Sequence, residues 1–225
     1  MKIITILIIG SISFIISCAP ARFVEPLQKK ELALGANLGG PVISQGGLTI
    51  PIPLTAIEVG YGLDTNLTIH GGIHTTALLF GNLQMDAGVT YKLLNQQKFI
   101  PNISVNPGFN FIYDLGDKVS KFWPTLDINA YWNYGKRSSY LYFGFSNIFE
   151  LSKTMALGQD QKQKWIFSPQ IGHVLKTKRE KWQFTAELKF LALNQDNSYT
   201  FLPYKSLTGS YGATGFYLGL RYIIK

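Results

Sequence analysis

Cysteine is nearly absent from this chain of 225 residues, which contains only one, Cys18. A single cysteine excludes an internal disulfide framework. Charged residues are also scarce, at 15% of the chain, against about 25% in ordinary soluble domains. The formal net charge of +8 first suggests an acidic partner, but the basic residues are spread along the chain. Because nucleic-acid binding requires a continuous basic face, this distribution argues against a nucleic-acid-binding protein.

Long hydrophobic runs are missing as well. After residue 18 no apolar stretch reaches the length of about 18 residues that would indicate a membrane-spanning helix. Hydrophobic residues nevertheless make up 46% of the sequence, and aromatic residues 14%. Two kinds of protein combine these features: a β-protein embedded in a bilayer, and a soluble barrel with an apolar interior.

The start of the chain has the features of an export signal. Lys2 is followed by an almost wholly apolar run, residues 3–16, which at about 14 residues is too short to span a bilayer and is typical of a secretory signal. The following Ile15-Ile16-Ser17-Cys18 resembles the bacterial lipobox. This resemblance implies a signal peptide over residues 1–17, a lipid on Cys18, a lipidated tether over residues 18–29 and a barrel domain over residues 30–225. An ordinary signal peptide followed by a chance cysteine is the alternative.

From about residue 30 the sequence alternates between apolar and polar residues, which is the signature of β-strands. In one such segment Leu83, Val89 and Tyr91 point one way while Gln84 and Thr90 point the other. Strands that cross a bilayer need roughly 9–11 residues, whereas soluble strands are usually near 5–6, so the length of these segments favours the membrane. The predicted strands number about ten and start near residues 30, 55, 66, 83, 100, 121, 139, 164, 182 and 212.

The connections between these strands differ in length in a regular way. Every second connection is short, as at Leu63-Asp64-Thr65 and residues 135–138, while the others include the long loops 39–54, 151–162 and 194–211. Short turns at one end and longer loops at the other are typical of outer-membrane barrels. An even number of strands then places both ends of the barrel domain on the short-turn, periplasmic side.

The sequence is similar in pattern to the small outer-membrane β-barrel proteins of Gram-negative bacteria. The segment Tyr61-Gly62-Leu63-Asp64-Thr65-Asn66-Leu67 resembles their tight periplasmic turn. The resemblance implies one antiparallel, up-and-down transmembrane barrel. Tyrosine and tryptophan favour the membrane–water interface. Such residues are predicted on the outer face near the periplasmic edge at Tyr61, Tyr91, Trp132, Tyr134, Trp182 and Tyr222, and aromatic residues near the opposite edge at Phe122 and Trp165.

The polar faces of the strands would line a narrow lumen filled by side chains. Because buried charges must be paired or hydrogen-bonded, we expect an internal polar network. Its predicted members are Glu58, His70, His74, Asp86, Lys92, Asp127, Glu187, Lys189 and Arg221. The expected register of the hairpin that turns at Gly81 sets His74 opposite Gly88 and His70 opposite Lys92. Arg221 is predicted to pair with Glu31 where the last strand closes on the first.

These residues predict no metal site, cofactor or catalytic group. His70 and His74 are about 13 Å apart along one strand, which is too far to share a zinc ion. A His74–Asp86 pair could act as a general base but lacks an obvious nucleophile. His173 is predicted on the lipid-facing side, where some outer-membrane enzymes that modify lipids have their sites. It has no matched serine and acid in the sequence.

The function predicted from the sequence is therefore non-enzymatic. We expect an outer-membrane barrel lipoprotein with a structural or interaction role, or a narrow channel, anchored by its lipid on the periplasmic side. The alternatives are an outer-membrane lipid-modifying enzyme and a soluble periplasmic lipoprotein barrel that binds an apolar ligand. The expected partners are outer-membrane lipids, with a protein partner reached through loops 39–54 and 194–211, where Tyr199, Phe201, Tyr204, Lys205 and Tyr211 lie.

Overall fold

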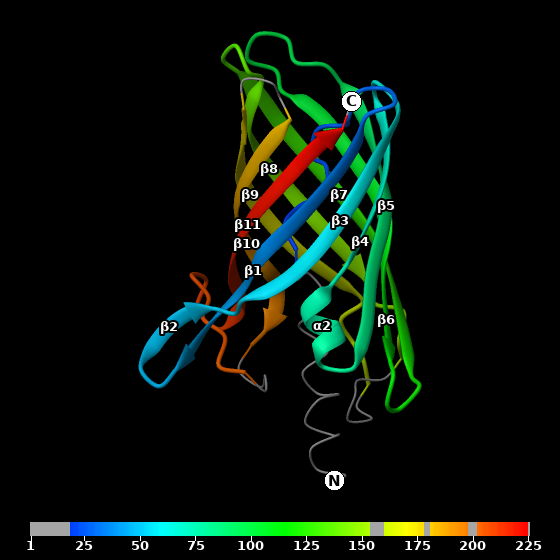
Figure 1. Cartoon of the computed structure of the whole chain (residues 1–225). Coiled ribbons are helices and arrows are strands. Elements are labelled where there is room, and N and C mark those ends of the chain that lie inside the picture. Colours follow the sequence, from blue (N-terminus) through cyan, green and yellow to red (C-terminus); the bar gives the residue numbers. More distant parts are fainter. Residues whose placement is uncertain (1–18, 154–159, 178–180, 198–201, 225) are drawn as a thin grey trace.

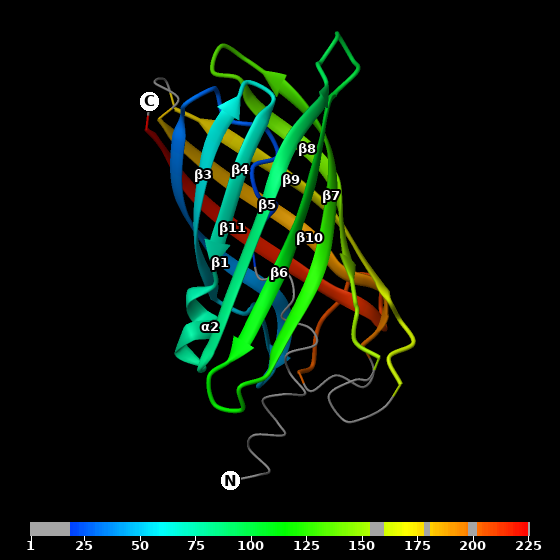
Figure 2. The same ribbon diagram turned by 90° about the vertical axis from the view of Figure 1, so that its right-hand side faces the viewer.

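The computed structural model describes residues 19–153, 160–177, 181–197 and 202–224. Ten long antiparallel strands form a closed barrel (Figures 1 and 2), in which each strand pairs with the next along the chain and β11 pairs back with β1. The barrel strands are β1 (Leu32–Gln45), β3 (Leu54–Asp64), β4 (Leu67–Ile73), β5 (Asn82–Leu94), β6 (Asn102–Asp114), β7 (Ser120–Tyr134), β8 (Ser139–Phe149), β9 (Trp165–Lys176), β10 (Trp182–Asp196) and β11 (Tyr211–Ile224).

This architecture confirms the predicted fold class. Every barrel strand begins within two residues of its predicted start. The short turns gather at the end of the barrel where β11 finishes, and the longer connections lie at the other end (Figure 1). No helix within the described ranges is long and apolar enough to cross a membrane.

The long-loop end differs from the prediction in two places. Residues 39–54 were expected to be a loop, but β1 continues to Gln45 and pairs with β2 (Leu48–Pro51). Gly46 and Gly47 both have positive φ angles, 59° and 81°, which suit a two-residue hairpin turn. The hairpin at Gly81 is also wider than expected, because Thr75–Leu79 form a short helix, α2.

The second long loop packs against this hairpin over its described part. Ile43 and Tyr204 form a β-bridge, and the Lys205 amide donates to the Val42 carbonyl at 2.8 Å. Tyr211 is exposed at the start of β11. Tyr199 and Phe201 lie outside the described residues.

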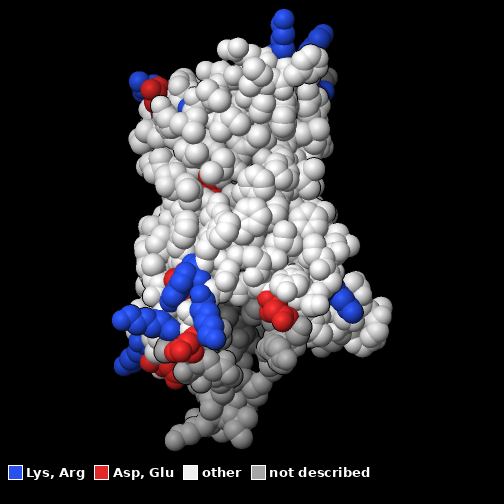
Figure 3. All heavy atoms as spheres, turned by 180° about the vertical axis from the view of Figure 1, so that it is seen from behind, with Lys and Arg blue, Asp and Glu red and all other residues white. Residues whose placement is uncertain are grey.

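The two faces of the barrel wall have opposite chemistry. Inward-facing positions hold buried polar side chains such as Thr68, Thr90 and Gln170, whereas outward-facing Ile57 and Phe184 are 51% and 50% exposed. Charged side chains gather near the two ends and are almost missing from the band between them (Figure 3). The alternation along each strand produces this arrangement because successive side chains point to opposite faces.

Aromatic residues lie on the outer face next to the short turns, as predicted. Tyr61, Tyr91, Trp132, Tyr134 and Trp182 are exposed. Each of them lies on the part of its strand that is nearest a short turn. At the opposite edge, the exposed aromatic side chains are Phe122 and Trp165.

Candidate functional site in the barrel lumen

Residues 19–27, here called the N-terminal segment, run inside the barrel (Figures 1 and 2). The side chains of Phe23, Val24 and Leu27 are almost fully buried there, and Arg22 is 6% exposed. Residues 18–29 were predicted to be a lipidated tether, and residues 19–27 of this range lie in the lumen. Cys18 itself lies outside the described residues.

Hydrogen bonds hold the backbone of the N-terminal segment to the wall along its length. The Ala21 amide donates to Glu187 at 2.9 Å, and the Leu27 amide donates to the Thr68 hydroxyl at 2.8 Å. Ser104 donates to the Val24 carbonyl at 2.6 Å. Since a buried backbone group without a partner is costly, these bonds allow an irregular segment to lie in the lumen.

Glycines in β3 and β4 make room for the segment. A Cβ atom at Gly60 would lie 2.3 Å from the Phe23 ring, and one at Gly72 would lie 2.4 Å from the Arg22 guanidinium. A Cβ atom at Gly62 would lie 2.0 Å from the carbonyl oxygen of Gln28. The inward faces of these two strands therefore form a recess that a larger side chain would fill.

Arg22 is the centre of the polar network. Its guanidinium donates to Glu58 at 2.6 Å and to both oxygens of Asp86 at 3.0 and 2.8 Å. Arg221, from β11, donates to the other oxygen of Glu58 at 2.7 and 2.9 Å. His74 Nε2 lies 2.9 Å from Asp86. The buried carboxylate of Glu58 and the partly buried one of Asp86 are thus each shared between Arg22 and partners on the wall.

The remaining predicted network residues have separate surroundings. His70 Nε2 contacts the Asn106 amide oxygen at 3.1 Å, and its ring stacks on Phe23. Lys189 lies 3.4 Å from Glu187 and donates to the Ala19 carbonyl at 3.2 Å. Lys92, only partly buried near the short-turn end of β5, is in none of the ion pairs found among the described residues.

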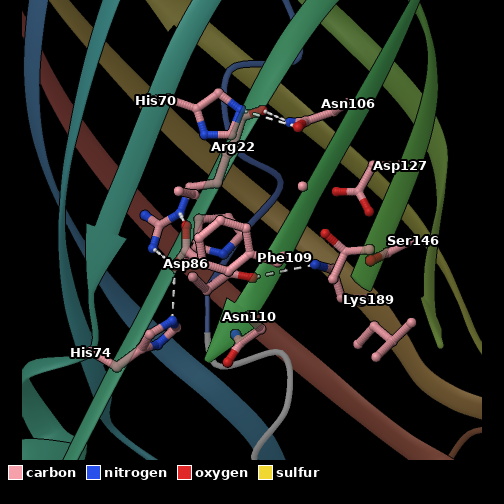
Figure 4. A pocket seen from close by; sticks show the side chains of 16 residues that line it. Arg22, His70, His74, Asp86, Asn106, Phe109, Asn110, Asp127, Ser146 and Lys189 are labelled. Carbon is pink, nitrogen blue, oxygen red and sulfur yellow. Dashed lines mark hydrogen bonds and ion pairs between the residues drawn. The ribbon is translucent and has the colours of Figure 1, made fainter. Parts of the chain in front are cut away.

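A small cavity adjoins this network (Figure 4). It has a volume of about 70 Å³, and Ala19, Arg22, His74, Asp127 and Lys189 are among the residues that line it. A space of roughly 10–15 Å³ suffices for one water molecule, so this cavity can hold several waters or a small hydrated ion.

Three predicted pairings are wrong. Arg221 pairs with Glu58 and not with Glu31. It lies opposite Gly35 of β1 and reaches across this residue to Glu58 on β3. His70, and not His74, lies opposite Gly88, so His70 does not lie opposite Lys92 either. The register shifts because residues 75–79 form α2 and lengthen the connection beyond the tight turn that was expected at Gly81.

Gly35 is the position on which the Glu58–Arg221 pair depends. A Cβ atom there would lie 2.7 Å from a carboxylate oxygen of Glu58 and 2.8 Å from its Cγ. We expect Gly35→Val to displace this carboxylate and to lower the free energy of unfolding by about 1–3 kcal/mol, as overpacking does. Urea unfolding in lipid vesicles measures the change. Ala36→Val is the matched control, because Ala36 is the next residue and faces outward; an equal loss in both variants would contradict the role given to Gly35.

Arg22 and the buried tyrosines of the lumen were not predicted from the sequence. Tyr142 donates to Glu187 at 2.6 Å, and Tyr131, Tyr140 and Tyr217 are also buried in the lumen. Arg22 does not lie in a segment of alternating apolar and polar residues, so no sequence pattern indicated that it faces the lumen. A signal was present in the charges, because the lumen contained more predicted acids than bases.

Within the described residues, no three His, Cys, Asp or Glu side chains are placed to hold a metal ion. Both histidines of the lumen have amide or carboxylate partners, as described above. On the outer face, His173 contacts the Tyr134 hydroxyl and stacks on its ring.

Comparisons with known proteins find similarity in structure alone. No protein-family model and no curated protein matches the sequence. The translocator domain of the autotransporter NalP from Neisseria meningitidis is 8% identical, covers 88% of this chain and 90% of its own, and has a TM-score of 0.49. An outer membrane channel from Pseudomonas putida F1 is 11% identical, with coverages of 91% and 98% and a TM-score of 0.47. The NanC porin is 9% identical, with coverages of 85% and 98% and a TM-score of 0.44. Similarity at this level assigns no function to the chain.

Proposed function

We propose that this protein is an integral β-barrel of a bacterial outer membrane, with its short turns towards the periplasm, and that it has a structural or interaction role there. One observation carries the proposal: an apolar outer band almost free of charged side chains surrounds a polar lumen. A soluble barrel would turn its apolar face inward to avoid water. Here Leu38, Ile57 and Leu218 are among the exposed residues of the band, while Glu58 and Lys189 are buried inside.

The filled lumen supports a structural or interaction role over that of an open pore. The N-terminal segment and the ion pairs of Glu58 and Asp86 lie where a permanently open channel would need water. The interaction role would use the long-loop end. Leu48 and Ile50 on β2 are 66% and 45% exposed there, and a protein partner reached through residues 39–54 and 194–211 belongs to this proposal.

Fractionation of cells that express the protein tests this proposal. Recovery in the outer-membrane fraction, with a gel mobility that changes on boiling, is the result expected of a closed membrane barrel. Recovery in the soluble periplasm would contradict the proposal and would direct attention to an apolar ligand.

The lipid anchor is a separate part of the proposal. Labelled palmitate is expected to enter the wild-type protein and to be lost in Cys18→Ala, while the barrel of this variant stays in the outer membrane because its wall is apolar. Since consecutive Cα atoms are about 3.8 Å apart, a lipid on Cys18 would begin next to the buried Ala19. Incorporation of the label would thus also mean that the start of the segment can leave the lumen. An unlabelled wild-type protein would leave an ordinary signal peptide as the explanation of residues 1–17.

A further inference from the structure

The N-terminal segment brings a further basic group to the carboxylates in the middle of the lumen. The wall brings four carboxylates into the lumen, those of Glu58, Asp86, Asp127 and Glu187, but its basic groups among them are Lys189 and Arg221. Arg22 belongs to the segment and contacts two of these four carboxylates. The segment also brings Glu25, which pairs with Lys176 at the short-turn end of β9, so its withdrawal leaves the net lumenal charge unchanged. The excess of negative charge that withdrawal creates is confined to the part of the lumen around these four carboxylates.

The wall also retains partners for the two carboxylates that Arg22 contacts. Glu58 keeps Arg221 at 2.7 Å and the Asn37 amide at 3.2 Å. Asp86 keeps His74 at 2.9 Å. Withdrawal of Arg22 thus leaves neither carboxylate bare, which lowers the cost of removing the segment compared with removing a sole partner.

The contacts of the N-terminal segment agree with a segment that can leave the lumen. The segment has no regular secondary structure, and its contacts with the wall are side-chain contacts and isolated hydrogen bonds, not a β-ladder. Gly60 and Gly72 of the wall form the recess that receives the segment. No covalent bond joins the segment to this recess.

We propose that residues 19–27 are a reversible plug latched by Arg22, and that the lumen conducts small monovalent cations in preference to anions once the plug is withdrawn. Acidic side chains select for cations because they stabilise a positive ion that has lost part of its hydration. This inference rests on the proposed function, since conduction requires a barrel that spans a membrane.

Conductance in planar bilayers tests the inference with the full chain purified from membranes. The wild type is expected to be closed for most of the time in potassium chloride. Arg22→Gln removes the charge of the latch, and we expect the open-to-closed ratio to rise about ten- to hundredfold, as for the loss of hydrogen bonds between charged groups. Arg137→Gln, on the exposed turn between β7 and β8, is the matched control and is expected to behave like the wild type.

A second variant acts by shape and leaves every lumenal charge in place. In Gly60→Leu the new side chain occupies the position of the Phe23 ring, so the plug is expected to be displaced and the open-to-closed ratio to rise. In both open variants the reversal potential under a potassium chloride gradient is expected to lie towards that of potassium. The double variant with Arg22→Gln and Asp86→Asn is expected to have a reversal potential closer to zero than Arg22→Gln alone.

The outcomes separate this inference from the proposed function. Variants that are recovered in the outer membrane and shift on boiling, yet stay closed, would overturn the plug. Open variants that prefer chloride would overturn the cation path. Absence of all variants and of the wild type from the outer membrane would instead contradict the proposed function.

Discussion

Replacing Glu58 with alanine is expected to lower the free energy of unfolding of the barrel by about 3–5 kcal/mol, the usual cost of removing one partner of a buried ion pair. Glu58 is 5% exposed and accepts hydrogen bonds from Arg22, Arg221 and Asn37. Its loss leaves two buried guanidinium groups without this carboxylate. Their charges cannot be removed by deprotonation, because arginine stays protonated in proteins.

Urea unfolding in lipid vesicles, followed by tryptophan fluorescence, measures this loss. Glu31→Ala is the control, since Glu31 lies at the rim and is only partly buried. Its loss is expected to be below about 1 kcal/mol, as for exposed ion pairs. Equal stabilities of the Glu58 and Glu31 variants would mean that the lumenal network contributes little to the fold.

Introducing arginine at Val89 is expected to cost about 2–4 kcal/mol of folding free energy in a bilayer. Val89 lies near the middle of β5, at an outward-facing position of the apolar band, so its replacement would meet the hydrocarbon core. A charge there loses its hydration and finds no partner in lipid.

The same substitution at Leu93 is the matched control for depth. Leu93 is exposed on the same strand but lies one residue before its end, near the short turns. At the interface the cost is expected to be only about 0–1 kcal/mol. Folding titrations of both variants into vesicles give the difference. If Val89→Arg were as harmless as Leu93→Arg, β5 would not cross a membrane.

Local patterns in the sequence were sufficient to place the strands, because the alternation of apolar and polar side chains involves only neighbouring residues. In β6, Asn102, Ser104 and Asn106 are buried in the lumen, while the Phe109 ring stacks on the exposed Phe122 of β7, as the alternation requires. The same argument predicted that β11 closes on β1, since an even number of strands brings the two together at one end. The exposed aromatic positions followed from the same parity.

Contacts between distant residues could not be predicted in this way. The Glu58–Arg221 pair depends on Gly35 standing between them on β1, which is a consequence of register across three strands. Register in turn depended on connections whose form was not evident, such as α2 and the β1–β2 hairpin. No turn connects β11 to β1, so nothing local indicated their register, and the prediction of a Glu31–Arg221 pair failed.

The N-terminal segment shows most clearly which features follow from local sequence patterns and which follow only from tertiary contacts. By itself the sequence determined a barrel with an apolar outside, a polar inside and short turns at one end, because period-two alternation and turn length are local properties. Only the tertiary structure decided that residues 19–27 lie in the lumen and that Arg22 joins Glu58 to Asp86. A segment without alternating residues gives no local sign of where it lies. Its place depends on the glycine recess and on the charged partners that ten closed strands bring together.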